Sequence, residues 1–228
     1  METTTKTKIY NLIILDKSGS MSDIKEEALS GYNETLGTIR TAQLKHIDTQ
    51  EHFVSLAAFC SCGVQMIYDK TPIKDAANLS GKDYVPCCCT PLFDAIGMTV
   101  QSLRAAIADD KTAAVLVTII TDGLENSSRE WSGASVKKLI EECKGLGWNF
   151  AYIGTDHDVE EVAANLSIGN TTAFVKSKES CKCMWDKQMD AFSTYFDMIE
   201  EEHATPAMSD ESRVFFRQAL SKNYYKKK

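Results

Sequence analysis

Apolar runs with the length of β-strands recur along the chain and alternate with segments in which apolar residues recur every three to four positions. The strand-like runs are rich in β-branched and aromatic residues, which favour pleated structure. They cover residues 8–15, 53–60, 64–69, 114–121, 149–155 and 171–175. Strand and helix patterns in alternation predict a largely parallel sheet with helices on both faces.

The helical stretches between and after these runs have apolar stripes of period 3.6. The predicted helices lie near residues 24–39, 96–107, 132–146, 159–166, 178–202 and 211–220. A capping box over residues 158–161 starts the fourth of them. The long amphipathic helix 178–202 has two interpretations: it packs back on the sheet, or it presents a face to a partner.

One pair of strand-like runs is not separated by a helix. Within Phe53–Asp69 only Ser61, Cys62 and Gly63 part the two runs, which predicts an antiparallel hairpin at the sheet edge. The predicted fold class is therefore α/β: a Rossmann-like, doubly wound, mostly parallel six-stranded sheet with one antiparallel edge strand. We expect one domain over residues 1–177 and a C-terminal helical segment over residues 178–228, which ends in a basic tail, Tyr224–Lys228.

Composition narrows the function classes. The chain has 228 residues, 43% of them hydrophobic, which is enough for one sizeable core, and its formal net charge is −7. Negative charge argues against nucleic acid and anionic membranes as partners. Residues 1–8 are polar and no apolar run approaches the length of a membrane span. We expect a cytoplasmic protein with its eight cysteines reduced.

Oxygen-bearing side chains follow two of the predicted strands and precede one helix. "DKSGS" provides Asp16, Ser18 and Ser20, "TDG" provides Asp122, and Thr90 stands at the start of "TPLFDAIG". Loops that follow parallel strands meet at one edge of the sheet. Two carboxylates and three hydroxyls suit a hard cation such as Mg²⁺, whereas zinc prefers histidine or thiolate.

Three segments, "DKSGSM" (16–21), "TPLFDAIG" (90–97) and "TDGLENSS" (121–128), together resemble a von Willebrand factor type A (vWA) domain. The resemblance extends from about Lys8 to Lys176. It implies a metal-ion-dependent adhesion site (MIDAS) with Mg²⁺ or Mn²⁺, in which the two serines are direct ligands and Thr90 binds directly or through water. Asp16 and Asp122 would act largely through waters. One coordination position would be left for an acidic side chain of a partner.

The resemblance implies a cation-dependent protein-binding module whose partner presents Asp or Glu, similar to intracellular bacterial proteins of this family. A Mg²⁺-dependent phosphoester hydrolase using the same site is the alternative. After the first strand, position 18 is serine, so the second acid of a D-x-D phosphatase motif is missing there, and G-x-x-x-x-G-K-[ST] does not occur in the sequence. We therefore expect no enzyme activity. Taken singly, the serines could cap a helix near Asp23, and Ser22 is assigned only that role.

Cysteines stand where relatives of this family commonly have glycines, at Cys87, Cys88 and Cys89. Cys60 and Cys62 lie in or beside the hairpin turn, which is expected at the same edge of the sheet. Either the five thiols contribute to a zinc site, or they are small fillers of tight loops.

Overall fold

The structure is a computed structural model that describes residues 6–110, 112–155, 159–205 and 208–220. Its sheet has six strands in the order β3-β2-β1-β4-β5-β6. All neighbours are parallel except β2 and β3, so the predicted antiparallel hairpin at the edge and the predicted fold class are both confirmed. The strands are β1 (Thr7–Asp16), β2 (Gln50–Cys60), β3 (Gly63–Pro72), β4 (Ala114–Ile120), β5 (Asn149–Gly154) and β6 (Asn170–Ala173).

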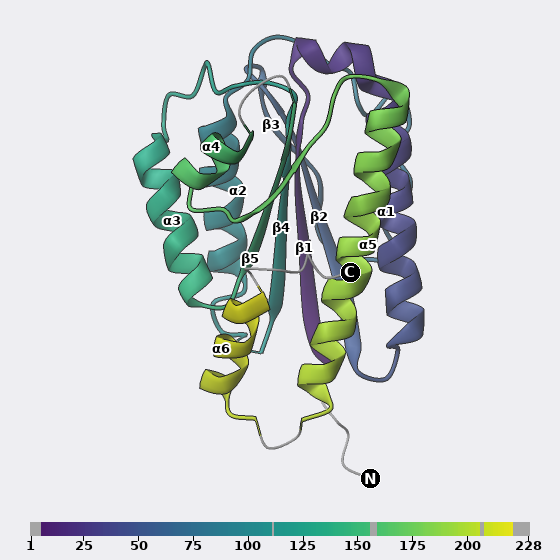
Figure 1. Cartoon of the computed structure of the whole chain (residues 1–228), viewed down its shortest axis with the longest axis vertical. Coiled ribbons are helices and arrows are strands. Elements are labelled where there is room, and N and C mark those ends of the chain that lie inside the picture. Colours follow the sequence, from purple (N-terminus) through teal and green to yellow (C-terminus); the bar gives the residue numbers. More distant parts are fainter. Residues whose placement is uncertain (1–5, 111, 156–158, 206–207, 221–228) are drawn as a thin grey trace.

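Helices cover both faces of the sheet, α1 and α5 on one and α2, α3 and α4 on the other (Figure 1). The predicted helices are found, with ends shifted by a few residues. Their bounds are α1 (Lys25–Lys45), α2 (Leu92–Ala106), α3 (Gly133–Gly145), α4 (Val159–Asn165), α5 (Lys178–His203) and α6 (Asp210–Leu220).

The central strands explain why the sequence reads as continuous apolar runs. Every residue of β4 is buried, and β1 is buried from Asn11 to Asp16, because helices pack on both sides of a doubly covered sheet. Such strands lack the alternation of a half-exposed strand and are recognised by their length and β-branched content.

Helix α5 packs on α1 and on the sheet. A side-chain carbon at Gly31 of α1 would lie 1.9 Å from the ring of Trp185, so only glycine lets the indole approach so closely. Trp185, Phe192 and Phe196 are buried in the core that α1 shares with the sheet. The core-packing interpretation of residues 178–202 therefore describes the structure, because the apolar stripe of this helix is already covered.

Helix α6 lies at the end of the sheet where the parallel strands begin, at the bottom of Figure 1. This is opposite the edge where the strands end. Arg217 and Glu202 are 2% and 1% exposed and form a two-pronged ion pair with both nitrogen–oxygen distances at 2.7 Å. Arg217 also donates to the carbonyl oxygens of Thr112 and Ala113. The pair therefore ties α6 both to α5 and to the loop before β4.

The turn after β1 differs from the expected helix start. A 3₁₀ helix, η1 (Gly19–Ile24), comes first, and α1 begins after Ile24 without a side-chain capping bond. Assigning Ser22 as a cap is therefore wrong, because the serines lie in or before the 3₁₀ turn. Asp158 of the expected capping box and the basic tail lie outside the described residues. No helix in the described ranges has the length and apolarity needed to span a membrane.

Candidate metal centre

Three loops meet at the carboxyl edge of the sheet, at the top of Figure 1. β1 and β4 are adjacent and parallel, with Leu15 opposite Ile120, so the residues that follow them emerge side by side. The segment before α2 joins them: the N–H of Asn126 donates to the carbonyl of Thr90 at 3.1 Å. The topology therefore brings "DKSGS", "TDG" and Thr90 to one place.

The five predicted side chains converge there. Ser18 and Ser20 Oγ atoms are 3.2 Å apart, and the Ser20 hydroxyl donates to Oδ1 of Asp122 at 2.6 Å. Asp16 accepts the backbone N–H of Ser18 at 2.6 Å. Thr90 completes the group, since a carbon added at Gly123 would lie 3.6 Å from Thr90 Oγ1 and 4.0 Å from Ser20 Oγ.

Four of the five side chains are buried and one is exposed. Asp16, Ser18, Thr90 and Asp122 are at most 3% exposed. Ser20, in contrast, is exposed to solvent. A ligand would therefore reach the group past Ser20.

The two carboxylates are in unlike environments. Burial raises the pKa of Asp16 to about 6, although hydrogen bonds from Thr121 and Ser18 work in the opposite direction. Oδ2 of Asp122 accepts no hydrogen bond from the described residues. The Lys176 ammonium lies 2.9 Å from this oxygen and forms an ion pair with it. A positive charge is thus already paired with one of the two buried carboxylates.

This donor set fits a hard divalent cation. Two carboxylates and three hydroxyls offer only oxygen, and Asp122 Oδ2 already pairs with a cationic group, the Lys176 ammonium at 2.9 Å. These five residues could hold Mg²⁺ or Mn²⁺.

Asn126 and Glu125 support the site, although the sequence motifs marked neither of them as a functional residue. Asn126 Oδ1 accepts the N–H of Thr90 at 2.8 Å. Glu125 accepts the N–H of Phe93 at 2.8 Å and that of Ser128 at 2.7 Å. Both lie within "TDGLENSS", so their position in this motif, three and four residues after Asp122, could have pointed to a role at the site. The polar run fixes Thr90 and the first turn of α2.

Asp94, Thr121 and Tyr84 are further supports. Asp94 accepts the backbone N–H groups of residues 129–131; burial alone would raise its pKa, yet these bonds leave the pKa lowered. The Thr121 hydroxyl donates to Asp16 Oδ2 at 2.6 Å. Tyr84 donates to the Asp16 carbonyl at 2.5 Å from an irregular loop, where no periodic pattern marks it.

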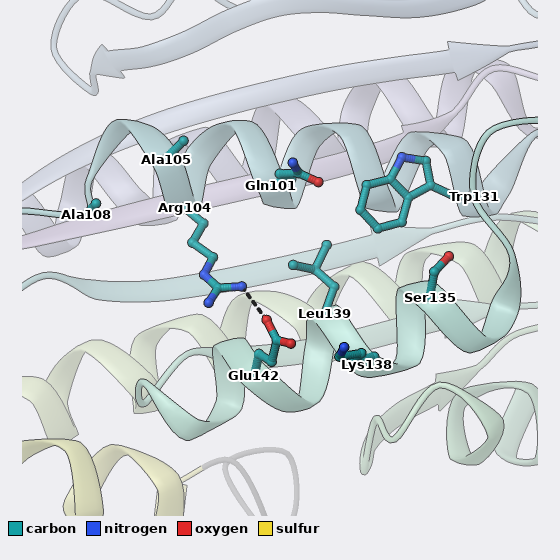
Figure 2. Close-up of a pocket in the computed structure, with 9 residues that line it drawn as sticks. All are labelled: Gln101, Arg104, Ala105, Ala108, Trp131, Ser135, Lys138, Leu139 and Glu142. Atoms are coloured by element: carbon teal, nitrogen blue, oxygen red, sulfur yellow. Dashed lines mark hydrogen bonds and ion pairs between the residues drawn. The ribbon is translucent and has the colours of Figure 1, made fainter.

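A groove of about 540 Å³ lies between α2 and α3 (Figure 2). Arg104 and Glu142 bridge it with an ion pair of 2.7 Å. Trp131 packs at one end, where a carbon added at Gly97 would lie 2.0 Å from the indole. A structural role, tying α2 to α3, accounts for these contacts.

No protein-family model and no curated protein matches the sequence. Solved structures do match it. The ArnB paralog VWA2 from Sulfolobus acidocaldarius is 16% identical over 82% of this chain, with a TM-score of 0.52. Proximal thread matrix protein 1 from the mussel byssus, with a zinc-occupied MIDAS motif, is 14% identical over 82%, with a TM-score of 0.55.

The manganese-loaded TRAP protein of Plasmodium vivax is 15% identical over 81% of this chain, with a TM-score of 0.50. The matches span 46%, 48% and 73% of those three chains, so the first two proteins are more than twice as long as the matched part. Identities this low carry information about the fold. The predicted resemblance is confirmed at that level: the chain has the fold of a von Willebrand factor type A domain.

Proposed function

We propose that this protein is a divalent-cation-dependent protein-binding module, in which Asp16, Ser18, Ser20, Thr90 and Asp122 hold Mg²⁺ or Mn²⁺. The observation that carries the proposal is the convergence of these side chains from three loops, with buried carboxylates facing hydroxyls. When bound, the cation supplies a positive centre that attracts an aspartate or glutamate of a protein partner.

The residue types suit that role. Hydroxyl ligands are neutral, so they offset little of the charge of the cation and leave it attractive to one more carboxylate. Asp16 is buried and orients Ser18 through the backbone. Ser20 is exposed and stands where a partner would approach.

Apolar side chains on the surrounding loops support a protein as the partner. Val85, Leu124 and Val175 are 55%, 54% and 67% exposed. Leu124 is two residues beyond Asp122, Val175 precedes Lys176, and Val85 follows Tyr84, whose hydroxyl binds the Asp16 carbonyl. Exposed apolar groups around a polar centre favour protein contact.

The same proposal places the protein in the bacterial cytoplasm. All eight cysteines lie in the described part of the chain and are free thiols, as a reducing compartment would keep them. The bacterial assignment rests on the sequence resemblance.

The test is affinity capture from the native cell with immobilised full-length protein, in Mg²⁺ and again in EDTA. We expect partners that are retained in Mg²⁺, lost in EDTA and lost with Asp122→Ala. Asp186→Ala, an exposed acid on α5, is the matched control and should retain them. Identical partners under all four conditions would contradict cation-mediated recognition.

The hydrolase alternative is tested on the same preparation with p-nitrophenyl phosphate. A binding module should release no p-nitrophenol beyond the rate that Mg²⁺ alone gives in buffer. Mg²⁺-dependent release that disappears with Asp16→Ala would instead favour the enzyme.

A further inference from the structure

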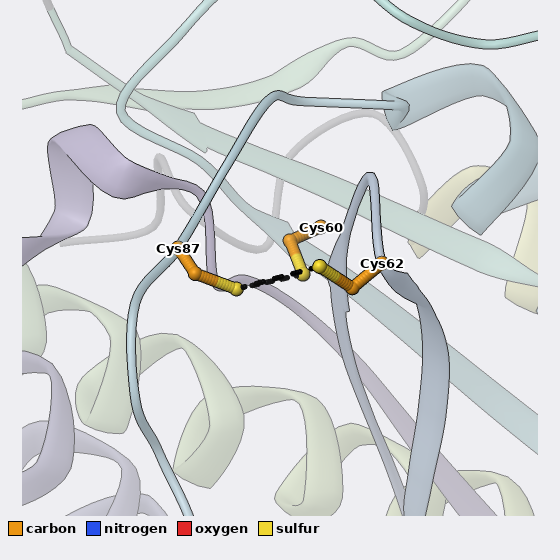
Figure 3. Close-up of side chains that lie close together, drawn as sticks. All are labelled: Cys60, Cys62 and Cys87. Atoms are coloured by element: carbon orange, nitrogen blue, oxygen red, sulfur yellow. Dashed lines mark hydrogen bonds between the residues drawn. The ribbon is translucent and has the colours of Figure 1, made fainter.

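A cluster of thiols lies beside the candidate metal centre and takes no part in it. The turn between β2 and β3 carries Cys62, Cys60 ends β2, and the loop before Thr90 carries Cys87 and Cys88. Figure 3 shows Cys60, Cys62 and Cys87 pointing toward one another from the two segments. We propose that Cys60, Cys62, Cys87 and Cys88 form a tetrathiolate site for Zn²⁺.

Backbone hydrogen bonds set the two segments against each other. The N–H of Ser61 donates to the carbonyl of Cys89 at 3.0 Å, and the N–H of Cys89 donates to the Ser61 hydroxyl at 3.1 Å. On its other side the loop is bonded to the β1 turn, through Cys87 N–H to the Lys17 carbonyl and Gly19 N–H to the Cys88 carbonyl. The thiols are therefore placed by three joined segments of main chain.

The sulfurs of Cys60, Cys62 and Cys87 are close enough to share one small ion, and Cys88 approaches the group through Cys62. Sγ of Cys60 lies 3.2 Å from that of Cys87, Cys62 lies 3.3 Å from Cys88, and Cys87 lies 4.0 Å from Cys62. The ligand atoms of Cys60, Cys62 and Cys87 all lie within 4.8 Å of one another. Sulfurs about 2.3 Å from a tetrahedral zinc are about 3.8 Å apart. All eight cysteines are free thiols, so these contacts are not disulfides.

Cys88 provides the fourth thiol through an unusual backbone conformation. Its φ is +62°, in the left-handed region that side chains with a Cβ rarely adopt. In an extended strand, successive side chains point to opposite faces. Here both Cys87 and Cys88 contact Cys62, so consecutive thiols face the same turn.

Exposure and chemistry agree with a structural zinc site. Cys60 is buried and Cys87 half-buried, whereas Cys62 and Cys88 are exposed, so an ion can enter from solvent. Binding forms four Zn–S bonds and releases four thiol protons to water. Of the five cysteines that the sequence suggested, Cys89 contributes its backbone but, in the described structure, no thiol contact with the other four.

Elemental analysis tests the site on reduced full-length protein that has been reconstituted with Zn²⁺ and passed through a desalting column. We expect one zinc per chain in the wild type. Cys62→Ser/Cys88→Ser should lose it, and both positions are exposed, so folding should be preserved. Cys183→Ser, at an exposed cysteine on α5, should keep it. Asp122→Ala should also keep it, which separates this site from the five-residue oxygen cluster.

Zinc that is absent from the wild type, unchanged in Cys62→Ser/Cys88→Ser, or lost with Asp122→Ala would overturn the proposal. Substitution with Co²⁺ gives a second readout. Four thiolates should produce strong sulfur-to-metal absorption in the near ultraviolet and intense visible bands. In the metal-loaded protein, four fewer thiols should react with a disulfide reagent than in the metal-free protein. If the four cysteines oxidise to two disulfides and the reduced protein shows no such bands, the cysteines are redox-active and do not form a metal site.

Discussion

Buried acids lie at two opposite ends of this molecule, and their carboxylates are paired in different ways. At one end Glu202 accepts two hydrogen bonds of 2.7 Å from the Arg217 guanidinium. At the carboxyl edge, Asp16 and Asp122 accept hydrogen bonds mainly from serine and threonine. Lys176 is the charged group beside Asp122, at 2.9 Å.

The difference separates a structural ion pair from a site suited to a mobile cation. The remaining guanidinium donors of Arg217 bind the carbonyls of Thr112 and Ala113, so both partners are buried and satisfied. Hydroxyls neutralise no charge, and the oxygen cluster opens to solvent at Ser20. Removing Arg217 should therefore affect folding, whereas changes at the carboxyl edge should affect cation binding.

The largest effect is expected from Arg217→Met. It leaves the Glu202 carboxylate buried without its main partner, and breaking such a pair lowers the free energy of unfolding by about 3–5 kcal/mol. Urea unfolding in EDTA measures this. Arg213→Met is the control, since Arg213 is 3.2 Å from Glu202 with its side chain 20% exposed, and it should lose about 1 kcal/mol or less. Equal losses from the two variants would contradict the structural assignment of the Arg217 pair.

Asp16→Asn should stabilise the protein in EDTA at pH 7. The pKa of Asp16 is about 6 in the folded chain against a reference of 3.8, so the charged form is disfavoured by folding. That shift corresponds to roughly 3 kcal/mol as an upper bound. The penalty is complete above pH 6 and disappears as the pH falls toward 4.

The measurement is the difference between the unfolding free energies of wild type and Asp16→Asn from pH 4 to 8. Burial also lowers the pKa of His52 to about 3, but His52 is common to both proteins and cancels in the difference. A difference that is constant with pH would mean that Asp16 carries no burial penalty. With Mg²⁺ present the order should reverse, because only the wild type then gains binding energy.

Asn126→Ala should weaken Mn²⁺ binding about 10- to 100-fold, because Asn126 holds the backbone of Thr90 and is a support rather than a ligand. Titration calorimetry measures the affinity. Asn165→Ala, at an exposed position at the end of α4, is the control and should bind as the wild type does. Wild-type affinity in Asn126→Ala would show that Thr90 needs no such support.

The smallest effect is expected from Lys176→Met, which removes the ammonium beside Asp122. A bound cation would have to share this carboxylate with Lys176, so we expect binding to tighten about fivefold, or roughly 1 kcal/mol. Titration calorimetry with Mn²⁺ measures this change in affinity. Weaker binding would mean that Lys176 helps to assemble the site instead of competing with the cation.

The architecture was predictable from the sequence because its elements are buried on their apolar sides. β4 is wholly buried and reads as an unbroken apolar run, while the stripe on α5 anticipates the contact of Trp185 with Gly31. Parallel topology then places the ends of β1 and β4 together. Hence Asp16, Ser18, Ser20, Thr90 and Asp122 could be predicted to converge. Their role as ligands stays a prediction, as does the domain division after residue 177.

The supports of the site could not be predicted in the same way. Tyr84 reaches the Asp16 carbonyl from an irregular loop, where only the three-dimensional path of the chain decides its contact. Ser22 looked like a helix cap because hydroxyls favour that position, but a 3₁₀ turn moved the start of α1 to Lys25. The left-handed conformation of Cys88 could not be predicted either, because glycine is the residue that usually marks a positive φ and none stands at this position.

Counting free Mn²⁺ by electron paramagnetic resonance shows directly whether the oxygen cluster holds one divalent cation. Wild type, Ser18→Ala/Ser20→Ala and Ser22→Ala would be titrated side by side, with Mg²⁺ as competitor. We expect one Mn²⁺ per chain in the wild type and in Ser22→Ala, displaced by Mg²⁺, and none in the double variant. Equal binding by all three proteins, or binding by none, would contradict this expectation.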